Sequence, residues 1–110
     1  METGDFPESD WKTFRALREV ALERFCNRVF AEVEALCRDL SRSPHERYLD
    51  LCRLLRERDK ELAYAFHDPR RSTMIVQLAA LHASGLFEPD ELARFTPRTR
   101  DVVESLRDDG

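Results

Sequence analysis

The chain has 110 residues, of which 42% are hydrophobic and 36% charged, and its 22 acidic and 18 basic residues give a formal net charge of −4. This length predicts one domain, and the mixed charge favours a solvated folded surface over a disordered tail. The sequence contains no apolar run near the ~18 residues of a membrane span and no basic-then-apolar start typical of a secretory signal. We therefore expect a soluble cytoplasmic protein.

The basic residues are sixteen Arg and two Lys, an imbalance typical of a GC-rich bacterial genome. Acids and bases are spread evenly along the chain, and no segment forms a basic arm. Because non-specific binding of nucleic acid needs clustered positive charge, this pattern disfavours it.

A long amphipathic pattern predicts a first helix from about Ser9 or Asp10, either of which can cap it, to about Leu40. The apolar residues that recur at steps of three and four are Trp11, Phe14, Leu17, Ala21, Phe25, Val29, Val33, Leu36 and Leu40. Thirty helical residues span about 45 Å, whereas a domain of this size has a radius of gyration of about 13 Å. The helix is therefore expected to be longer than the rest of the domain and to project from it.

A second helix is predicted from Pro44 to about Phe66. Ser43 and Glu46 have the spacing of a capping box, with Pro44 at the first helical position. The short connection before Ser43 favours an antiparallel return along the first helix.

A third helix is predicted to open at Asp68-Pro69 and to run through an apolar stretch, Met74–Ala83. Being apolar nearly all round, it belongs in the centre of a bundle, with a narrow solvent edge. That edge comprises Thr73, Gln77, Ala80 and Ser84. Gly85 is expected to end the helix in a Schellman motif, with Leu86 against Leu81.

Glu88-Pro89 and Thr96-Pro97 begin two short helices, the first ending near Phe95 and the second running through Leu106. No alternating run or hairpin turn predicts a strand. The predicted fold is thus an all-α, single-domain bundle of about five helices over residues 9–108, preceded by a flexible tail at residues 1–8.

The sequence contains none of the short motifs of nucleophilic, phosphate-binding or zinc-dependent catalysis. The three cysteines, Cys26, Cys37 and Cys52, are widely spaced and are interpreted as small buried hydrophobic residues. His82 shares a helix face with Ile75 and Leu78, typical of a core histidine. We therefore expect no catalytic residues, no metal site and no cofactor.

Arg70, Arg71, Ser72 and Thr73 follow the predicted helix start at Pro69 and form a possible anion site. The simpler alternative is that the arginines pair with acids on a neighbouring helix and the hydroxyls only cap. The segment Met74–Leu106 also has the helix, glycine-containing turn and helix of a DNA-binding unit. Acidic residues on its last helix offset the arginines, so nucleic acid is an unlikely partner.

The leading functional hypothesis is a non-enzymatic interaction or regulatory module that forms a homodimer. An unidentified protein is a possible further partner. Alternatives are a nucleic-acid-binding regulator and a small anion- or ligand-binding protein. Trp11, Phe14 and Leu17 lie furthest from the turn at Pro44, so they are the predicted dimer interface. The rival is burial of these residues by the later helices. Arg18 and Asp59, at similar heights on facing helices, are predicted to form a buried ion pair.

Overall fold

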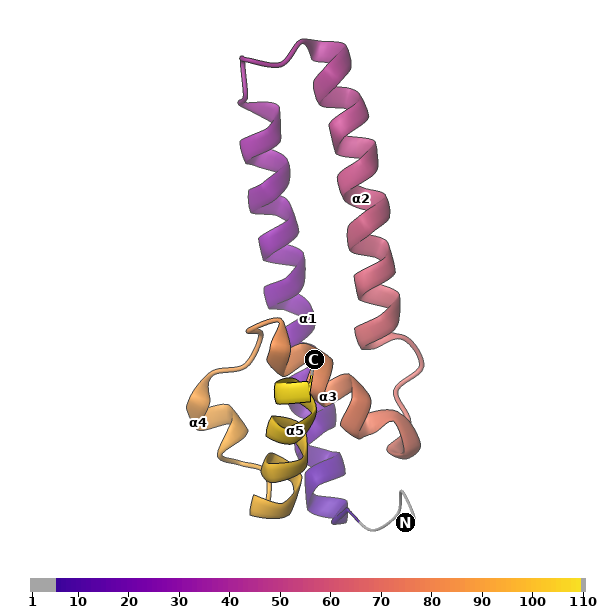
Figure 1. Ribbon diagram of the computed structural model, residues 1–110, viewed down its shortest axis with the longest axis vertical. Helices are drawn as coiled ribbons and strands as arrows, with labels where there is room; N and C mark the ends of the chain where they lie inside the picture. Colours follow the sequence, from indigo (N-terminus) through magenta and orange to yellow (C-terminus); the bar gives the residue numbers. More distant parts are fainter. Residues whose placement is uncertain (1–5, 110) are drawn as a thin grey trace.

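Among residues 6–109, five α-helices and one short 3₁₀ helix make up the fold (Figure 1). The structure, a computed structural model, describes residues 6–109, with side chains as far as Leu106. In chain order the elements are α1 (Glu8–Cys37), α2 (Pro44–Phe66), the 3₁₀ helix η2 (Arg71–Thr73), α3 (Met74–Ala83), α4 (Pro89–Leu92) and α5 (Pro97–Asp109). No strand occurs among residues 6–109, and the predicted all-α fold is confirmed.

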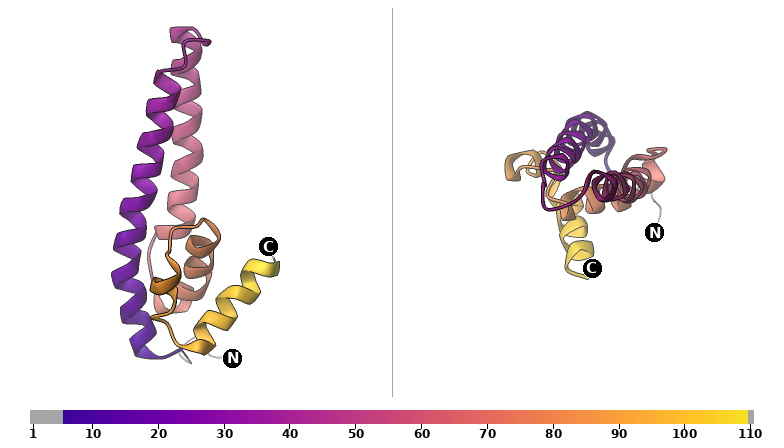
Figure 2. Two further views of the ribbon diagram at one scale, coloured as in Figure 1. Left: turned by 90° about the vertical axis from the view of Figure 1, so that its left-hand side faces the viewer. Right: turned by 90° about the horizontal axis from the view of Figure 1, so that it is seen from above.

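The two long helices, α1 and α2, form an antiparallel hairpin that gives the molecule its elongated shape of 53 × 25 × 24 Å. The other helices gather at the open end of this hairpin and on one side of it (Figure 2). We call that end the body; it comprises α1 as far as Phe25, α2 from Leu62 and everything after α2. The rest of α1 and α2 is the projecting half. The first helix thus outruns the body, as its length predicted.

The turn between the two long helices is fixed by the predicted capping box. Ser43 Oγ accepts the Glu46 backbone N–H at 3.1 Å, and Glu46 Oε1 accepts the Ser43 N–H at 2.8 Å. Arg47 adds a bond from its Nη1 to the Cys37 carbonyl, 2.6 Å away. These bonds satisfy polar groups at both helix ends, so α2 returns along α1 at once.

The start of α1 differs from the prediction. Its N-cap is Pro7, one residue before the helix and two before Ser9, and no side chain caps it. The Asp10 carboxylate is instead buried, with 1% of the residue exposed, and accepts bonds from the start of α5. Thr96 donates its N–H at 3.0 Å and its hydroxyl at 2.7 Å, and the Thr99 hydroxyl donates as well. A carboxylate suits the positive end of a helix dipole, so Asp10 ties α5 to α1.

The third helix also opens later than predicted. Asp68 takes a left-handed conformation with φ of 49°, and η2 intervenes before α3 begins at Met74. Gln77, expected at the solvent edge, is 4% exposed and donates to the His67 carbonyl at 2.8 Å. The expectation for Gln77 was wrong because the last carbonyls of α2 need donors that the helix itself cannot supply.

The end of α3 confirms the Schellman motif. Gly85 has φ of 72°, its N–H bonds to the His82 carbonyl at 2.9 Å, and the Leu86 N–H bonds to the Leu81 carbonyl at 3.1 Å. This pattern of two reversed bonds is what defines the motif. It turns the chain back so that Leu86 enters the core.

The hydrophobic core lies wholly in the body. Its buried apolar residues are Phe14, Leu17, Ala21, Ala65, Phe66, Met74, Leu78, Leu81, Leu86, Phe87, Phe95 and Val103. They come from every α-helix except α4, which contributes the half-buried Leu92. The projecting half therefore has no part in this core and is stabilised by contacts between α1 and α2, with bonds from Arg28 to the body at its base.

Part of the predicted flexible tail belongs to the folded domain. Phe6 packs against the core, and the Arg98 guanidinium lies 4.6 Å from its ring centroid. Glu8 is the first residue of α1. Residues 1–5 of that predicted tail lie outside the described residues.

Candidate interaction surface

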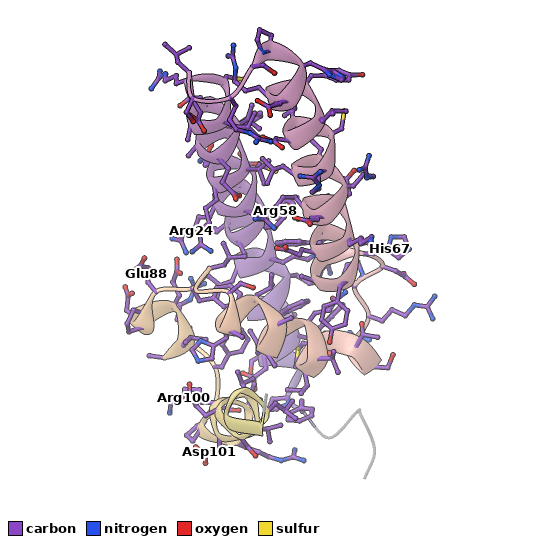
Figure 3. All side chains as sticks on the ribbon, turned by 45° about the horizontal axis from the view of Figure 1, so that its top comes forward. Arg24, Arg58, His67, Glu88, Arg100 and Asp101 are labelled. Atoms are coloured by element: carbon purple, nitrogen blue, oxygen red, sulfur yellow. The ribbon has the colours of Figure 1, made fainter. Side chains whose placement is uncertain are left out.

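The inner side of the hairpin, which faces the body, is charged. Arg58 forms two bonds to the Glu32 carboxylate, at 2.9 and 2.8 Å, and a third to Glu61 at 2.5 Å. A groove of about 370 Å³ on this side is lined by Phe25, Arg28, Val29, Glu32, Arg58, Glu61 and Ser84. Arg58 is labelled between the two helices in Figure 3. Its hydrogen bonds lower the pKa of Glu32, so the carboxylate stays charged well into the acid range.

The opposite side of the hairpin carries two rows of apolar side chains, which together we call the outer apolar face. It consists of Cys26, Phe30, Val33 and Cys37 on α1 with Tyr48, Cys52 and Leu55 on α2. Within each helix these residues follow at steps of three and four, which places them in one row. Phe30 is 65% exposed, Tyr48 62% and Leu55 42%.

The two rows lie on the same side of the hairpin. A second groove, of about 380 Å³, is lined by Arg18 and Leu22 of α1 and by α2 residues that include Asp59 and Leu62. Leu22 continues the α1 row, four residues before Cys26, and Asp59 continues the α2 row, four residues after Leu55. The body helices lie on the other side, so nothing among residues 6–106 covers the outer apolar face (Figure 2).

All three thiols belong to this face. Cys37 is exposed, and Cys26 and Cys52 are half-buried. The expectation that the cysteines are buried was wrong for all three, because they lie on the projecting half, outside the core of the body. None of the three forms a disulfide.

The predicted dimer interface is not on the surface. Phe14 is 0% exposed and Leu17 1%, and both lie in the core of the body. Trp11 is half-buried, stacks on Phe14 with a centroid distance of 5.9 Å, and has the Arg71 guanidinium over its ring. The rival expectation, intramolecular burial by the later helices, describes these residues. These residues are buried because the chain after α2 returns to the N-terminal end of α1. The end of the hairpin that no later helix covers is the turn between α1 and α2.

Arg18 and Asp59 line the same groove, but each is engaged differently from the predicted ion pair. Arg18 Nη2 donates to the Phe66 carbonyl at 2.6 Å, and Nη1 lies 2.9 Å from the Glu19 carboxylate. Arg18 therefore closes the C-terminal end of α2, where free carbonyls attract a cation. Asp59 is exposed to solvent.

The predicted anion site is occupied by internal partners. Arg70 pairs with Asp68 at 2.7 Å, and Arg71 pairs with Glu8 of α1 at 2.7 Å. Thr73 Oγ1 accepts the Arg70 N–H at 3.1 Å, and Ser72 is exposed. The segment forms η2 rather than the first turn of a long helix, so the arrangement favours the simpler alternative of ion pairs and capping.

The C-terminal helices present a mixed surface. Thr99 and Val103 of α5 are buried, and Glu104 lies 2.6 Å from the Nε2 atom of the buried His82. His82 is thus a core histidine with a partner, as predicted from its helix face. Asp101 and Glu104 are exposed on α5, which places negative charge where a DNA-reading helix would meet phosphates.

Arginine side chains from the long helices hold the chain reversals in place. Arg28 donates to the carbonyls of Ser84 and Gly85, at 2.5 and 2.7 Å. Arg24 donates to the Leu86 carbonyl and forms a two-bond pair with Glu91 of α4, at 2.6 and 2.9 Å. That pair lowers the pKa of Glu91. These contacts fix the segment between α3 and α4 against α1.

The part of the chain that the structure describes holds no group of three His, Cys, Asp or Glu side chains arranged to bind a metal ion. Within that same part, every helix is too short or too polar to pass through a lipid bilayer.

Comparison of the chain with protein-family models, curated protein sequences and solved structures finds no match. Its function is therefore inferred from its fold and surface. Sequence reasoning placed the apolar surface at the wrong end of the hairpin and did not single out Phe30 or Tyr48. The available signal was that Phe30 and Cys37 form a second apolar row on α1, beside the row that meets α2.

Proposed function

We propose that the protein is a non-enzymatic interaction module that self-associates through the outer apolar face of its helical hairpin. The single observation that supports this most is the exposure of Phe30, Tyr48 and Leu55 on one side of the projecting half. Large apolar residues gathered on a projecting surface normally mark an interface.

A second copy of the chain is the occupant that fits. The body and the charged groove lie on the opposite side, so two hairpins can meet face to face without steric obstruction. Two-fold pairing uses the same patch on both copies and is the commonest form of oligomer. The result is a four-helix arrangement in which apolar rows cover apolar rows.

The size of the face agrees with a modest dimer. From Leu22 to Cys37 the helix spans about 24 Å, and two helices side by side are about 20 Å wide. Two such faces bury about 1,000 Å², near the lower limit for a specific interface. We therefore expect a dimer whose population depends on protein concentration.

Light scattering coupled to size exclusion over a hundredfold concentration range tests the proposal. The wild type should move from a mass near 12.9 kDa towards twice that value as concentration rises. Tyr48→Ser and Phe30→Ser should remain monomeric. Tyr64→Ser is the matched control, because Tyr64 is 66% exposed on α2 but lines a groove on the body side.

A constant mass near 12.9 kDa for the wild type would overturn self-association. Equal weakening by Tyr48→Ser and Tyr64→Ser would place any dimer contact elsewhere than the outer apolar face.

A further inference from the structure

A small pocket lies between α3, α4 and α5, away from the hairpin. Its volume is about 110 Å³, and its lining residues are Leu78, Leu92, Phe95, Thr99, Arg100, Val103 and Glu104. Four of these side chains are purely apolar. The pocket is smaller than the ~150 Å³ cavity that holds benzene in an engineered protein, so it suits a compact apolar group of four or five carbons.

Two charged side chains line the pocket, and only one of them has a partner among the described residues. Glu104 is engaged by His82. Arg100 forms no ion pair in residues 6–106, and its Nε atom is buried without a hydrogen-bond acceptor. A buried guanidinium N–H without a partner costs stability. Figure 3 labels Arg100 on α5.

We propose that this pocket binds a short branched carboxylic acid, with its alkyl group among Leu78, Leu92 and Val103 and its carboxylate on Arg100. The guanidinium presents a flat fork of donors that matches a carboxylate. Thr99 is already committed to Asp10, so Arg100 is the group that selects the ligand's charge. This site is separate from the outer apolar face, and the two proposals stand or fall independently.

The test uses 3-methylbutanoate as the probe and 3-methylbutanamide, its neutral isostere, as the comparison ligand. Both are titrated into ¹⁵N-labelled protein, and the amide signals of Leu78, Leu92 and Val103 are followed by NMR. Saturable shifts with a millimolar dissociation constant are expected for so small an acid. The amide should bind at least about tenfold more weakly, because it lacks the charge-assisted bonds.

Three variants make the assignment specific. Arg100→Met keeps the apolar stem and should abolish the preference for acid over amide. Arg94→Met removes an equal charge from an exposed position and should preserve that preference. Leu92→Phe fills the pocket and should abolish the shifts with both probes, which keeps the proposal testable even if Arg100→Met does not fold.

The proposal is overturned by any of three results. The first is the absence of saturable shifts in the wild type. The second is equal affinity for acid and amide, or a preference that survives in folded Arg100→Met. The third is unchanged binding in Leu92→Phe, which would place the probe outside this pocket.

Discussion

At the scale of single residues, the fold depends on charged side chains that satisfy backbone groups far away in sequence. Asp10 accepts hydrogen bonds from the start of α5, and arginines donate to carbonyls at the C-terminal ends of three helices. Arg18 serves α2, Arg28 serves α3 and Arg47 serves α1. An arginine offers several donors in a fixed fork, so it can bond a free carbonyl and still reach an acid. The arginine-rich composition thus has a structural use.

Replacing Asp10 should be the most damaging single change outside the apolar core. Asp10→Ala leaves the half-buried Thr96 N–H and the buried Thr99 hydroxyl without their acceptor, and we expect a loss of about 2–4 kcal/mol in the free energy of unfolding. Urea denaturation followed by circular dichroism measures it. Ser9→Ala, at the exposed neighbouring position, should change stability by less than about 0.5 kcal/mol. A small loss for Asp10→Ala would show that solvent replaces the carboxylate.

The pair between Glu32 and Arg58 should support the hairpin only above acid pH. The pKa of Glu32 is lowered in the folded protein from its usual 4.5, so its stabilisation is complete above that value and is lost as pH falls through the lower folded pKa. Since these side chains are 40% and 27% exposed, we expect a coupling energy of about 0.5–1 kcal/mol at neutral pH. A double-mutant cycle should find it at pH ~7 and not at pH ~2. Equal coupling at both values would contradict the charge-based account.

At the scale of helices, the ends are set by short local signals. The Ser43–Glu46 box and the Gly85 ending lie where the sequence predicted them, because each needs only residues within one turn. The start of α1, the start of α3 and the burial of Gln77 were mispredicted. Asp10 and Gln77 are both polar groups whose partners, Thr96 and the His67 carbonyl, come from other elements. Local spacing cannot reveal such partners, and for the same reason it did not reveal that the later helices bury Phe14 and Leu17.

Gly85→Ala should destabilise the protein by about 1 kcal/mol, because an alanine is strained at a φ of 72°. Space is not the cause, since an added Cβ would lie 3.5 Å from Arg28 Nη2, an ordinary contact. Chemical denaturation measures the loss, with the exposed neighbour Ser84→Ala as the control. No loss would mean that α3 can end in another conformation.

At the scale of the whole molecule, stability is expected to be uneven. The body holds all of the buried apolar core, whereas the projecting half has only one helix packed on another. Regions with few buried contacts open most readily. Under the proposed self-association, this two-helix extension is the part that a second copy would stabilise most.

Hydrogen exchange should reveal this gradient and its dependence on concentration. In dilute protein, backbone amides of α1 after Val29 and of α2 before Leu55 should exchange faster than those of α3. Raising the protein concentration should slow exchange in the projecting half and leave α3 unchanged, because the proposed self-association would cover only the hairpin. Exchange that is slow throughout and independent of concentration would contradict both the gradient and the proposed interface.

The bonds from Asp10 to Thr96 and Thr99 also bear on the order in which the chain folds. They join residues 86 and 89 positions apart, whereas the hairpin closes through bonds between near neighbours at its turn. Contacts between residues close in sequence form early. Contacts between distant residues form later, because closing a long loop costs more chain entropy. During synthesis the hairpin can assemble as soon as α2 is made. The body can close only after the last helix has been synthesised, so the nascent chain first carries its core side chains, Phe14 and Leu17 among them, uncovered.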